Sequence, residues 1–168
     1  MILPDVNVLI YAFRADAARH ATCRSWLGEV IAGDARFGIS PLALSAVVRI
    51  TTNPRVFPRA SSIEDAFGFC EDLLGQPHCQ IVEPGERHWS IFERLCRETR
   101  TFGNPVTDAW YAALAIEWGC EWITFDRDFG RFPGLKWSTP SMSSAMSCAI
   151  VVAIGSSASS RSTTGKRT

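Results

Sequence analysis

The sequence lacks the patterns that mark secreted, membrane-spanning and zinc-binding proteins. Its six cysteines include no C-x-x-C pair, and none is spaced with His20, His78 or His88 as zinc ligands are. The first residues, MILPDVNVLIYAF, have no basic lead-in and reach Asp5 early, which is unlike a signal peptide. The longest apolar run, in AMSCAIVVAIG, is too short for a bilayer. We therefore expect a soluble, reduced, cytoplasmic protein with no membrane partner.

Net charge and internal repeats are also absent. The 17 basic and 17 acidic side chains cancel, so bulk charge neither indicates nor excludes a nucleic acid partner. Any basic surface has to be local. With 168 residues, 46% of them hydrophobic and 20% charged, the chain suffices for one domain with a real core.

Short apolar segments alternate with helical patterns along residues 1–138. The strand candidates are MILP, RFGIS, CQIVEP, CEWITF and a last one at residues 135–137, and helical spacing fills the first three intervals between them. This alternation predicts an α/β fold, a three-layer α/β/α sandwich with a mostly parallel central sheet. Residues 139–168 are Ser-rich, without acids and basic at the end, so we expect a largely disordered tail outside the domain.

The segment NPVTDAWYAALAIEWG, residues 104–119, is an apolar helix pattern with an acid near its start. After Asp108 its only charge is Glu117, so we expect protein to cover this helix on nearly all sides. A tight GC connection joins it to the strand CEWITF, which makes the two antiparallel. A helix of about 12 residues rises roughly 18 Å and five strand residues roughly 16 Å, so Asp108 is expected to return beside Asp126.

Three acids are thereby predicted to meet at one edge of the sheet. Asp5 lies at the carboxyl end of the first strand, Asp126 follows the strand WITF, and Asp108 returns to the same edge. Ligands of parallel sheets bind outside the carboxyl ends of the strands. Carboxylates in one cleft repel unless protons or a cation intervene, and oxygen ligands suit Mg²⁺ or Mn²⁺. Such a site is suited to phosphodiester cleavage, so these acids are candidate catalytic residues.

Each of these residues also has an ordinary structural explanation. Asp108 beside Thr107 is a favourable acid at a helix start, Asp5 can cap the helix that follows it, and Asp126 can be a turn residue. Several arginines fall in segments near the predicted cleft. They could form a rim that binds phosphate, or they could be arginines scattered over the surface, and the sequence favours neither explanation. They are Arg14, Arg49, Arg55, Arg59, Arg127 and Arg131, of which Arg14, Arg49 and Arg127 are taken as the candidates for binding a nucleic acid backbone.

Three motifs resemble the VapC-type toxins of the PIN-domain ribonuclease family, in its mycobacterial branch. They are DVNVLIYA at 5–12, ITTNPRVF at 50–57 and TDAWYAALAIEWGCEWITFDRDFGRFPGLKW at 107–137, and the resemblance covers residues 1 to about 138. It implies a Mg²⁺-dependent endoribonuclease, with Mn²⁺ as a substitute ion. It also implies a homodimer held by a cognate VapB-type antitoxin that covers the active site.

The same resemblance implies roles for individual residues. Asp5 and Asp108 would be the principal metal ligands and Asp126 a further acid, a role that Asp128 would share or replace. Asn7 would order the first loop through hydrogen bonds. Thr107, beside Asp108, would support the site.

One position departs from the family pattern. Many PIN domains carry a Glu on the helix after the second strand, and the corresponding position here, at about Ala46, has no acid. Three functions stay open from the sequence. They are metal-activated cleavage of RNA, a degenerate PIN domain that binds RNA or antitoxin without cleavage, and, more weakly, a phosphatase of small phosphoesters.

Overall fold

A sheet of five parallel strands forms the centre of the protein, which a computed structural model describes over residues 1–141. The strand order is β3-β2-β1-β4-β5. The strands are β1 (Ile2–Pro4), β2 (Phe37–Ile39), β3 (Cys79–Ile81), β4 (Glu121–Ile123) and β5 (Lys136–Ser138). The predicted parallel sheet is confirmed. Most of the predicted tail, from residue 142 on, lies outside the described residues.

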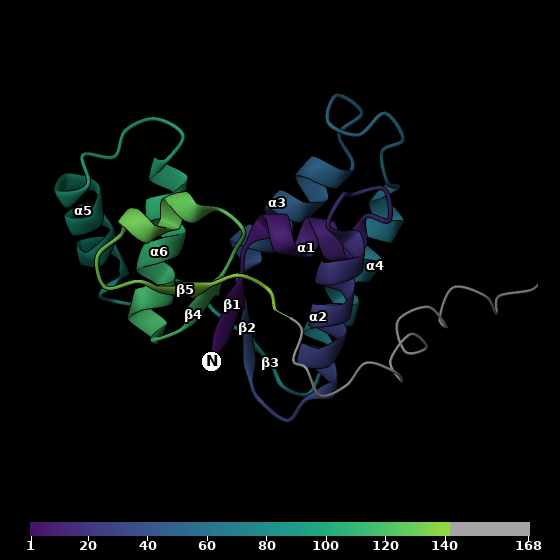
Figure 1. Cartoon of the computed structure of the whole chain (residues 1–168), viewed down its shortest axis with the longest axis horizontal. Helices are drawn as coiled ribbons and strands as arrows, with labels where there is room; N and C mark the ends of the chain where they lie inside the picture. Colours follow the sequence, from purple (N-terminus) through teal and green to yellow (C-terminus); the bar gives the residue numbers. More distant parts are fainter. Residues whose placement is uncertain (142–168) are drawn as a thin grey trace, which may run out of the picture.

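Helices cover both faces of this sheet. They are α1 (Val6–Phe13), α2 (His20–Ala32), α3 (Pro41–Thr51), α4 (Ile63–Leu74), α5 (His88–Glu98) and α6 (Val106–Trp118), with a 3₁₀ helix, η1 (Arg127–Arg131). The crossovers from β1 to β2 and from β2 to β3 step one way across the sheet, and the crossover from β3 to β4 steps back. Right-handed connections therefore place α1 to α4 on one face and α5 and α6 on the other, as Figure 1 shows. The three-layer architecture is confirmed.

Local capping residues set two helix ends, and one of them is the tight GC connection that the sequence predicts. The Ser62 side chain accepts a hydrogen bond from the Asp65 amide at 3.0 Å and starts α4. Gly119, with a φ of 64°, ends α6, and the Cys120 amide donates to the Ala115 carbonyl at 2.8 Å. This left-handed turn makes the tight connection that returns the chain along β4.

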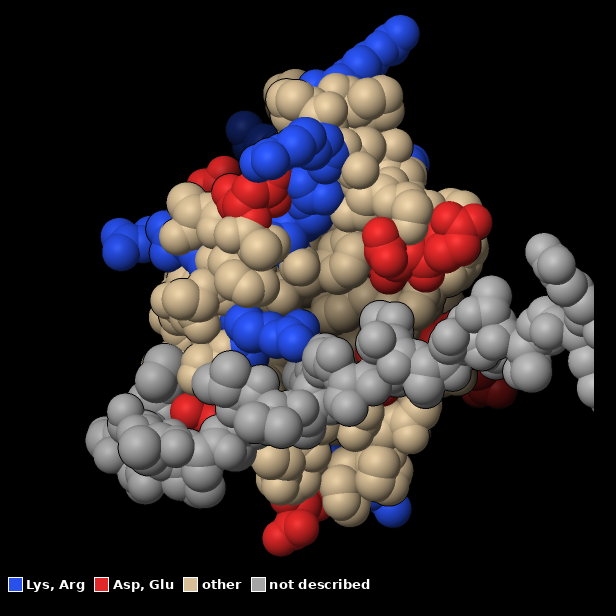
Figure 2. All heavy atoms as spheres, turned by 90° about the vertical axis from the view of Figure 1, so that its right-hand side faces the viewer, with Lys and Arg blue, Asp and Glu red and all other residues tan. Residues whose placement is uncertain are grey.

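Basic side chains are unevenly distributed over the surface. On the face drawn in Figure 2 they gather toward the upper end, where the loop between α3 and α4 lies in Figure 1. That loop carries the exposed Arg55 and Arg59. The neutral chain therefore carries a local concentration of basic side chains at this end of the molecule.

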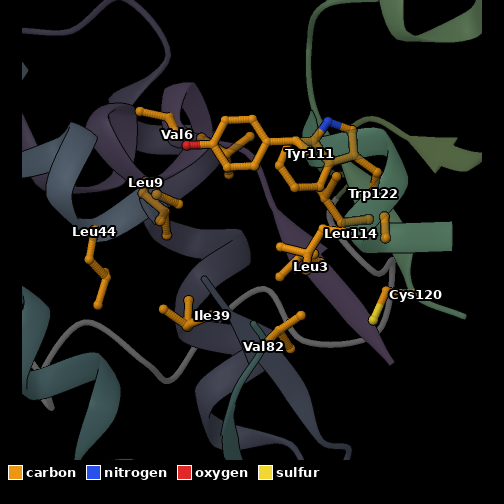
Figure 3. Packing of buried hydrophobic residues seen from close by; sticks show 14 of the residues in the cluster. Leu3, Val6, Leu9, Ile39, Leu44, Val82, Tyr111, Leu114, Cys120 and Trp122 are labelled. Carbon is orange, nitrogen blue, oxygen red and sulfur yellow. The ribbon is translucent and has the colours of Figure 1, made fainter. Parts of the chain in front are cut away.

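The core joins α6 to the sheet through aromatic rings. Tyr111 stacks on the fully buried Trp122 with ring centroids 5.3 Å apart, and Phe129 lies 5.3 Å from Trp122 on another side. Figure 3 shows Tyr111 reaching from α6 toward α1, above Leu114. The prediction that protein covers α6 on nearly all sides is correct for the middle of the helix and wrong for its last turn. There Trp118 is 37% exposed, and its indole N–H donates a hydrogen bond to the Glu83 carbonyl at 2.8 Å.

The five cysteines within residues 1–141 are free. In the same part of the chain, no helix is both long enough and apolar enough to cross a membrane.

Candidate active site at the carboxyl edge of the sheet

A small cleft of about 180 Å³ lies at the carboxyl edge of the sheet. Asp5 follows β1, Asp126 follows β4, and Asp108 lies in the first turn of α6. The predicted convergence of these three acids is therefore present in the fold. The lining consists of Asp5, Val6, Asn7, Ala46, Arg49, Ile50, Thr107, Asp108, Tyr111, Asp126 and Phe129.

Asp5 is the most enclosed of the acids, with 5% of its surface exposed. It precedes α1, but its side chain makes no capping hydrogen bond and instead accepts one from the Thr124 hydroxyl at 2.6 Å. Burial raises the pKa of the Asp5 carboxyl to about 6, although Thr124 and the backbone amide of Val6 act to lower it, and the charge of Asp108 raises it further. Asp5 is thus held rigidly where its negative charge is disfavoured.

Thr124 is a site residue that the sequence analysis missed. Its hydroxyl donates to Asp5 and accepts from the backbone amide of Asp126 at 3.0 Å, so one buried group joins two of the acids. The available sequence signal was a polar residue inside the otherwise apolar run WITF, two positions before an acid. The hydroxyl fixes the Asp5 side chain relative to the chain that follows β4.

Asp108 is half-buried and faces charges of both signs. Burial is the main cause that raises the pKa of its carboxyl, and Asp126 and Asp128 raise it further. Arg131 opposes this rise, and its guanidinium lies 3.3 Å from an Asp108 carboxylate oxygen. Arg131 therefore belongs to the site, whereas the sequence placed it among arginines that could equally be scattered over the surface.

Asp126 has a structural role as well as a place in the cleft. Its carboxylate accepts a hydrogen bond from the Asp128 amide at 2.8 Å and caps η1. This agrees with the structural explanation of Asp126 as a turn residue. Asp128 itself is exposed and is not part of the cleft lining, but it is near enough to raise the pKa of Asp108. Of the two alternatives left open by the sequence, Asp126 is the one that faces the cleft.

The three RNA-backbone candidates lie in different surroundings. Arg49, in the last turn of α3, lines the cleft, and Arg127 is exposed on η1. Arg14 pairs with Asp16 at 2.7 Å and donates to the Ser61 hydroxyl at 2.7 Å, which ties the end of α1 to the loop before α4. The guanidinium of Arg14 is thus engaged in contacts within the protein.

The PIN domain family matches residues 2–135 of the sequence. The chain belongs to the PIN-domain family. This PIN-domain chain is 39% identical over 140 residues to the VapC ribonuclease Mb2897 of Mycobacterium bovis, a match that covers 83% of this chain and 95% of that protein.

Solved PIN-domain structures share the fold at lower identity. VapBC2 of Rickettsia felis, bound to a promoter DNA fragment, has a TM-score of 0.60 at 17% identity, over 83% of this chain and 98% of that one. VapC20 of Mycobacterium tuberculosis, a sarcin-ricin loop cleaving toxin, has a TM-score of 0.57 at 18% identity, over 81% and 99% of the two chains. These likenesses agree with the three-layer fold.

The cleft of this PIN domain fits a hard divalent cation with few protein ligands. Within residues 1–141 no group of three His, Cys, Asp or Glu side chains is placed to hold a metal ion together. Ala46 lines the cleft, so the acid missing from the sequence pattern is missing from the site itself. Mg²⁺ usually keeps several waters and takes only one or two carboxylates. Asp5 and Asp108, whose charges act on each other, fit that requirement.

Proposed function

We propose that this PIN-domain chain is a metal-dependent endoribonuclease and the toxin of a toxin–antitoxin pair. The observation that carries the proposal is the single cleft lined by Asp5, Asp108 and Asp126, which come from three separate parts of the fold. The identity of 39% to a VapC ribonuclease, along most of both chains, supports RNA as the substrate.

In this proposal Asp5 and Asp108 hold Mg²⁺, or Mn²⁺ in its place, and Asp126 is a further acid, with Asp128 outside the cleft as its alternative. An ion of this kind, when bound, supplies an activated water and offsets charge on the leaving oxygen. Thr124 holds the Asp5 carboxylate in one orientation through its hydrogen bond of 2.6 Å. Arg49 lines the cleft, where its guanidinium can meet a phosphate oxygen of the RNA backbone.

The proposed partners follow from the same family membership. We propose a cytoplasmic homodimer held by a cognate VapB-type antitoxin. The support for an antitoxin is that the fold neighbour from Rickettsia felis is a VapBC assembly.

Cleavage of total cellular RNA by the purified chain tests the function. The reactions contain Mg²⁺ or Mn²⁺, or EDTA, and Asp108→Asn is run beside the wild type. Asp34→Asn is the matched control, because Asp34 is an exposed acid that precedes β2 at the opposite edge of the sheet. We expect discrete fragments that require the metal. Because loss of a group that only supports a metal ligand costs about 10- to 100-fold, loss of a ligand should cost at least about a hundredfold.

A second function is favoured by Ala46, which leaves the cleft with fewer acids than many PIN domains have. In that case the chain binds RNA or antitoxin without cutting it. Retention of RNA that survives both EDTA and Asp108→Asn, with no fragments from folded wild-type protein, would establish this alternative and reject the nuclease. An aryl phosphate in the same assay tests for a phosphatase.

A further inference from the structure

The loop between α5 and α6, residues 99–105, holds a large apolar side chain in solvent. Phe102 is 84% exposed, the highest value among the large hydrophobic side chains of residues 1–141. In that part of the chain no other aromatic ring or cation contacts it. Core packing therefore does not account for an aromatic residue at this position.

The turn that leads to Phe102 adopts a conformation unfavourable for its own sequence. Helix α5 ends in a Schellman motif, in which the Thr101 amide donates to the Cys96 carbonyl at 2.9 Å and the Arg100 amide to the Arg97 carbonyl at 3.3 Å. The left-handed position of this motif is Arg100, with a φ of 51°, whereas α6 uses Gly119 at the same position. A left-handed φ is costly for a residue with a Cβ atom, and such outliers cluster at functional sites.

A second turn holds the other side of Phe102. Gly103 has a φ of 69°, the Val106 amide donates to the Gly103 carbonyl at 3.1 Å, and the Thr107 amide donates to the Asn104 carbonyl at 3.1 Å. Phe102 therefore lies between two left-handed residues, both of them held by hydrogen-bonded turns. The exposed phenyl ring therefore belongs to a loop that has a hydrogen-bonded turn on each side.

This loop lies at the end of the molecule that carries the candidate active site. Phe102 precedes Asp108 by six residues, which span at most about 20 Å and less where the chain turns. Figure 1 shows this loop and the α3–α4 loop rising at the same end, on either side of the strands' carboxyl ends. Arg100 is exposed, and within residues 1–141 no carboxylate forms an ion pair with it. A cation and an aromatic ring thus lie together at the end of the molecule that carries the cleft.

We propose that Phe102 stacks on an unpaired nucleobase of the RNA substrate, with Arg100 beside it for the adjoining phosphate. The inference rests on the proposed function and deepens it, because it assigns the substrate an unpaired segment near the cut. Aromatic rings stack on bases that are splayed out of a helix, whereas bases inside duplex RNA are already stacked. The chain between Phe102 and Asp108 spans at most about 20 Å, which keeps the stacked base near the scissile phosphate.

Fluorescence of 2-aminopurine tests the stacking without cleavage. Asp108→Asn protein in EDTA is titrated into single-stranded RNAs that carry 2-aminopurine at successive positions. We expect quenching at one or two adjacent positions. Phe102→Ala and Phe102→Leu should lose the quenching and weaken binding about tenfold, and Phe102→Trp should restore both. Phe67→Ala, at a 51% exposed phenylalanine on α4, is the matched control and should change neither.

Three results would overturn the inference. The first is unchanged quenching and affinity in Phe102→Ala. The second is an RNA affinity of Phe102→Leu equal to that of the wild type, which would indicate apolar contact without stacking. The third is an altered oligomeric state of Phe102→Ala in size-exclusion chromatography with unchanged RNA affinity, which would assign the ring to a protein contact.

Steady-state cleavage separates this inference from the proposed function. In the active protein, Phe102→Ala should raise KM about tenfold and leave kcat nearly unchanged, and Phe102→Trp should return KM to its original value. Wild-type cleavage with the same KM in Phe102→Ala would remove the stacking role and leave the nuclease intact. If the folded wild type does not cut RNA at all, the proposed function fails, and the fluorescence titration still decides whether Phe102 stacks on a base.

Discussion

Asp5 is kept in a position where burial disfavours its charge. The free acid has a pKa of 3.8 and the folded protein raises it to about 6, chiefly through desolvation. The folded state therefore holds this proton more tightly than the unfolded state does. The stability that the protonated form contributes is fully present below the pKa of 3.8 in the unfolded state. It is lost as pH rises through the pKa of about 6 in the folded state.

The first prediction is a fall in stability of the metal-free protein between pH 4 and pH 7. A pKa difference of about two units corresponds to roughly 3 kcal/mol of unfolding free energy. Urea unfolding in EDTA across this range measures it, and Asp5→Asn should flatten the decline while Asp34→Asn should not. An equal pH dependence in wild type and Asp5→Asn would contradict the burial of this charge.

Thr124 is expected to matter more than an ordinary buried threonine. Thr124→Val keeps the shape of the side chain but leaves the Asp5 carboxylate and the Asp126 amide without their shared partner. The expected loss is about 1–3 kcal/mol of unfolding free energy, with cleavage reduced by at least about tenfold. Urea unfolding and RNA cleavage measure the two effects. Thr124→Ser retains the hydroxyl and both hydrogen bonds and is the control. A Val variant as stable and as active as the wild type would show that these hydrogen bonds are not what matters.

At the level of elements, the helix ends show which local structure a sequence can predict. Ser62 and Gly119 are recognisable from the sequence because a cap depends on a few neighbouring residues. The left-handed Arg100 is not recognisable, because no local preference favours arginine there. The exposed last turn of α6 was also missed, since helical periodicity does not reveal where a neighbouring layer ends.

Arg100→Gly should separate stability from RNA binding. Relief of the left-handed strain should raise the unfolding free energy by about 1 kcal/mol, while loss of the cation should weaken RNA binding several-fold. Thermal unfolding and RNA titration at fixed salt measure the two effects. Arg100→Lys keeps the charge and the strain, so it should leave both nearly unchanged. A lower unfolding free energy in Arg100→Gly than in the wild type would mean that the arginine side chain supports the turn.

For the whole molecule, the parallel three-layer architecture was predictable, whereas the strand order and the contacts between elements were not. Alternating strands and helices require a parallel sheet whose carboxyl ends share an edge, which is why the meeting of Asp5, Asp108 and Asp126 could be derived from the sequence. The pairing of Arg131 with Asp108 depends on how η1 packs beside α6. No spacing in the sequence specifies that packing.

The acids of the cleft come from distant parts of the chain, so a bound cation should stabilise the whole fold. A ligand that binds only the folded state adds RT ln(1 + [L]/Kd) to the unfolding free energy. Mn²⁺ should therefore raise the melting temperature of the wild type, and Asp108→Asn should largely abolish the rise. Ala46 lies in this cleft and offers a place for one more carboxylate.

Ala46→Glu should lower the melting temperature in EDTA, because it adds a negative charge beside Asp5 and Asp108, and should enlarge the rise caused by Mn²⁺. A tenfold lower Kd adds about 1.4 kcal/mol at excess metal. Differential scanning calorimetry in EDTA and in excess Mn²⁺ measures both effects. Ala32→Glu, at an exposed alanine at the end of α2 that leads into β2, is the matched control and should leave the rise unchanged. Equal rises in wild type and Ala46→Glu would mean that the ion binds outside this cleft.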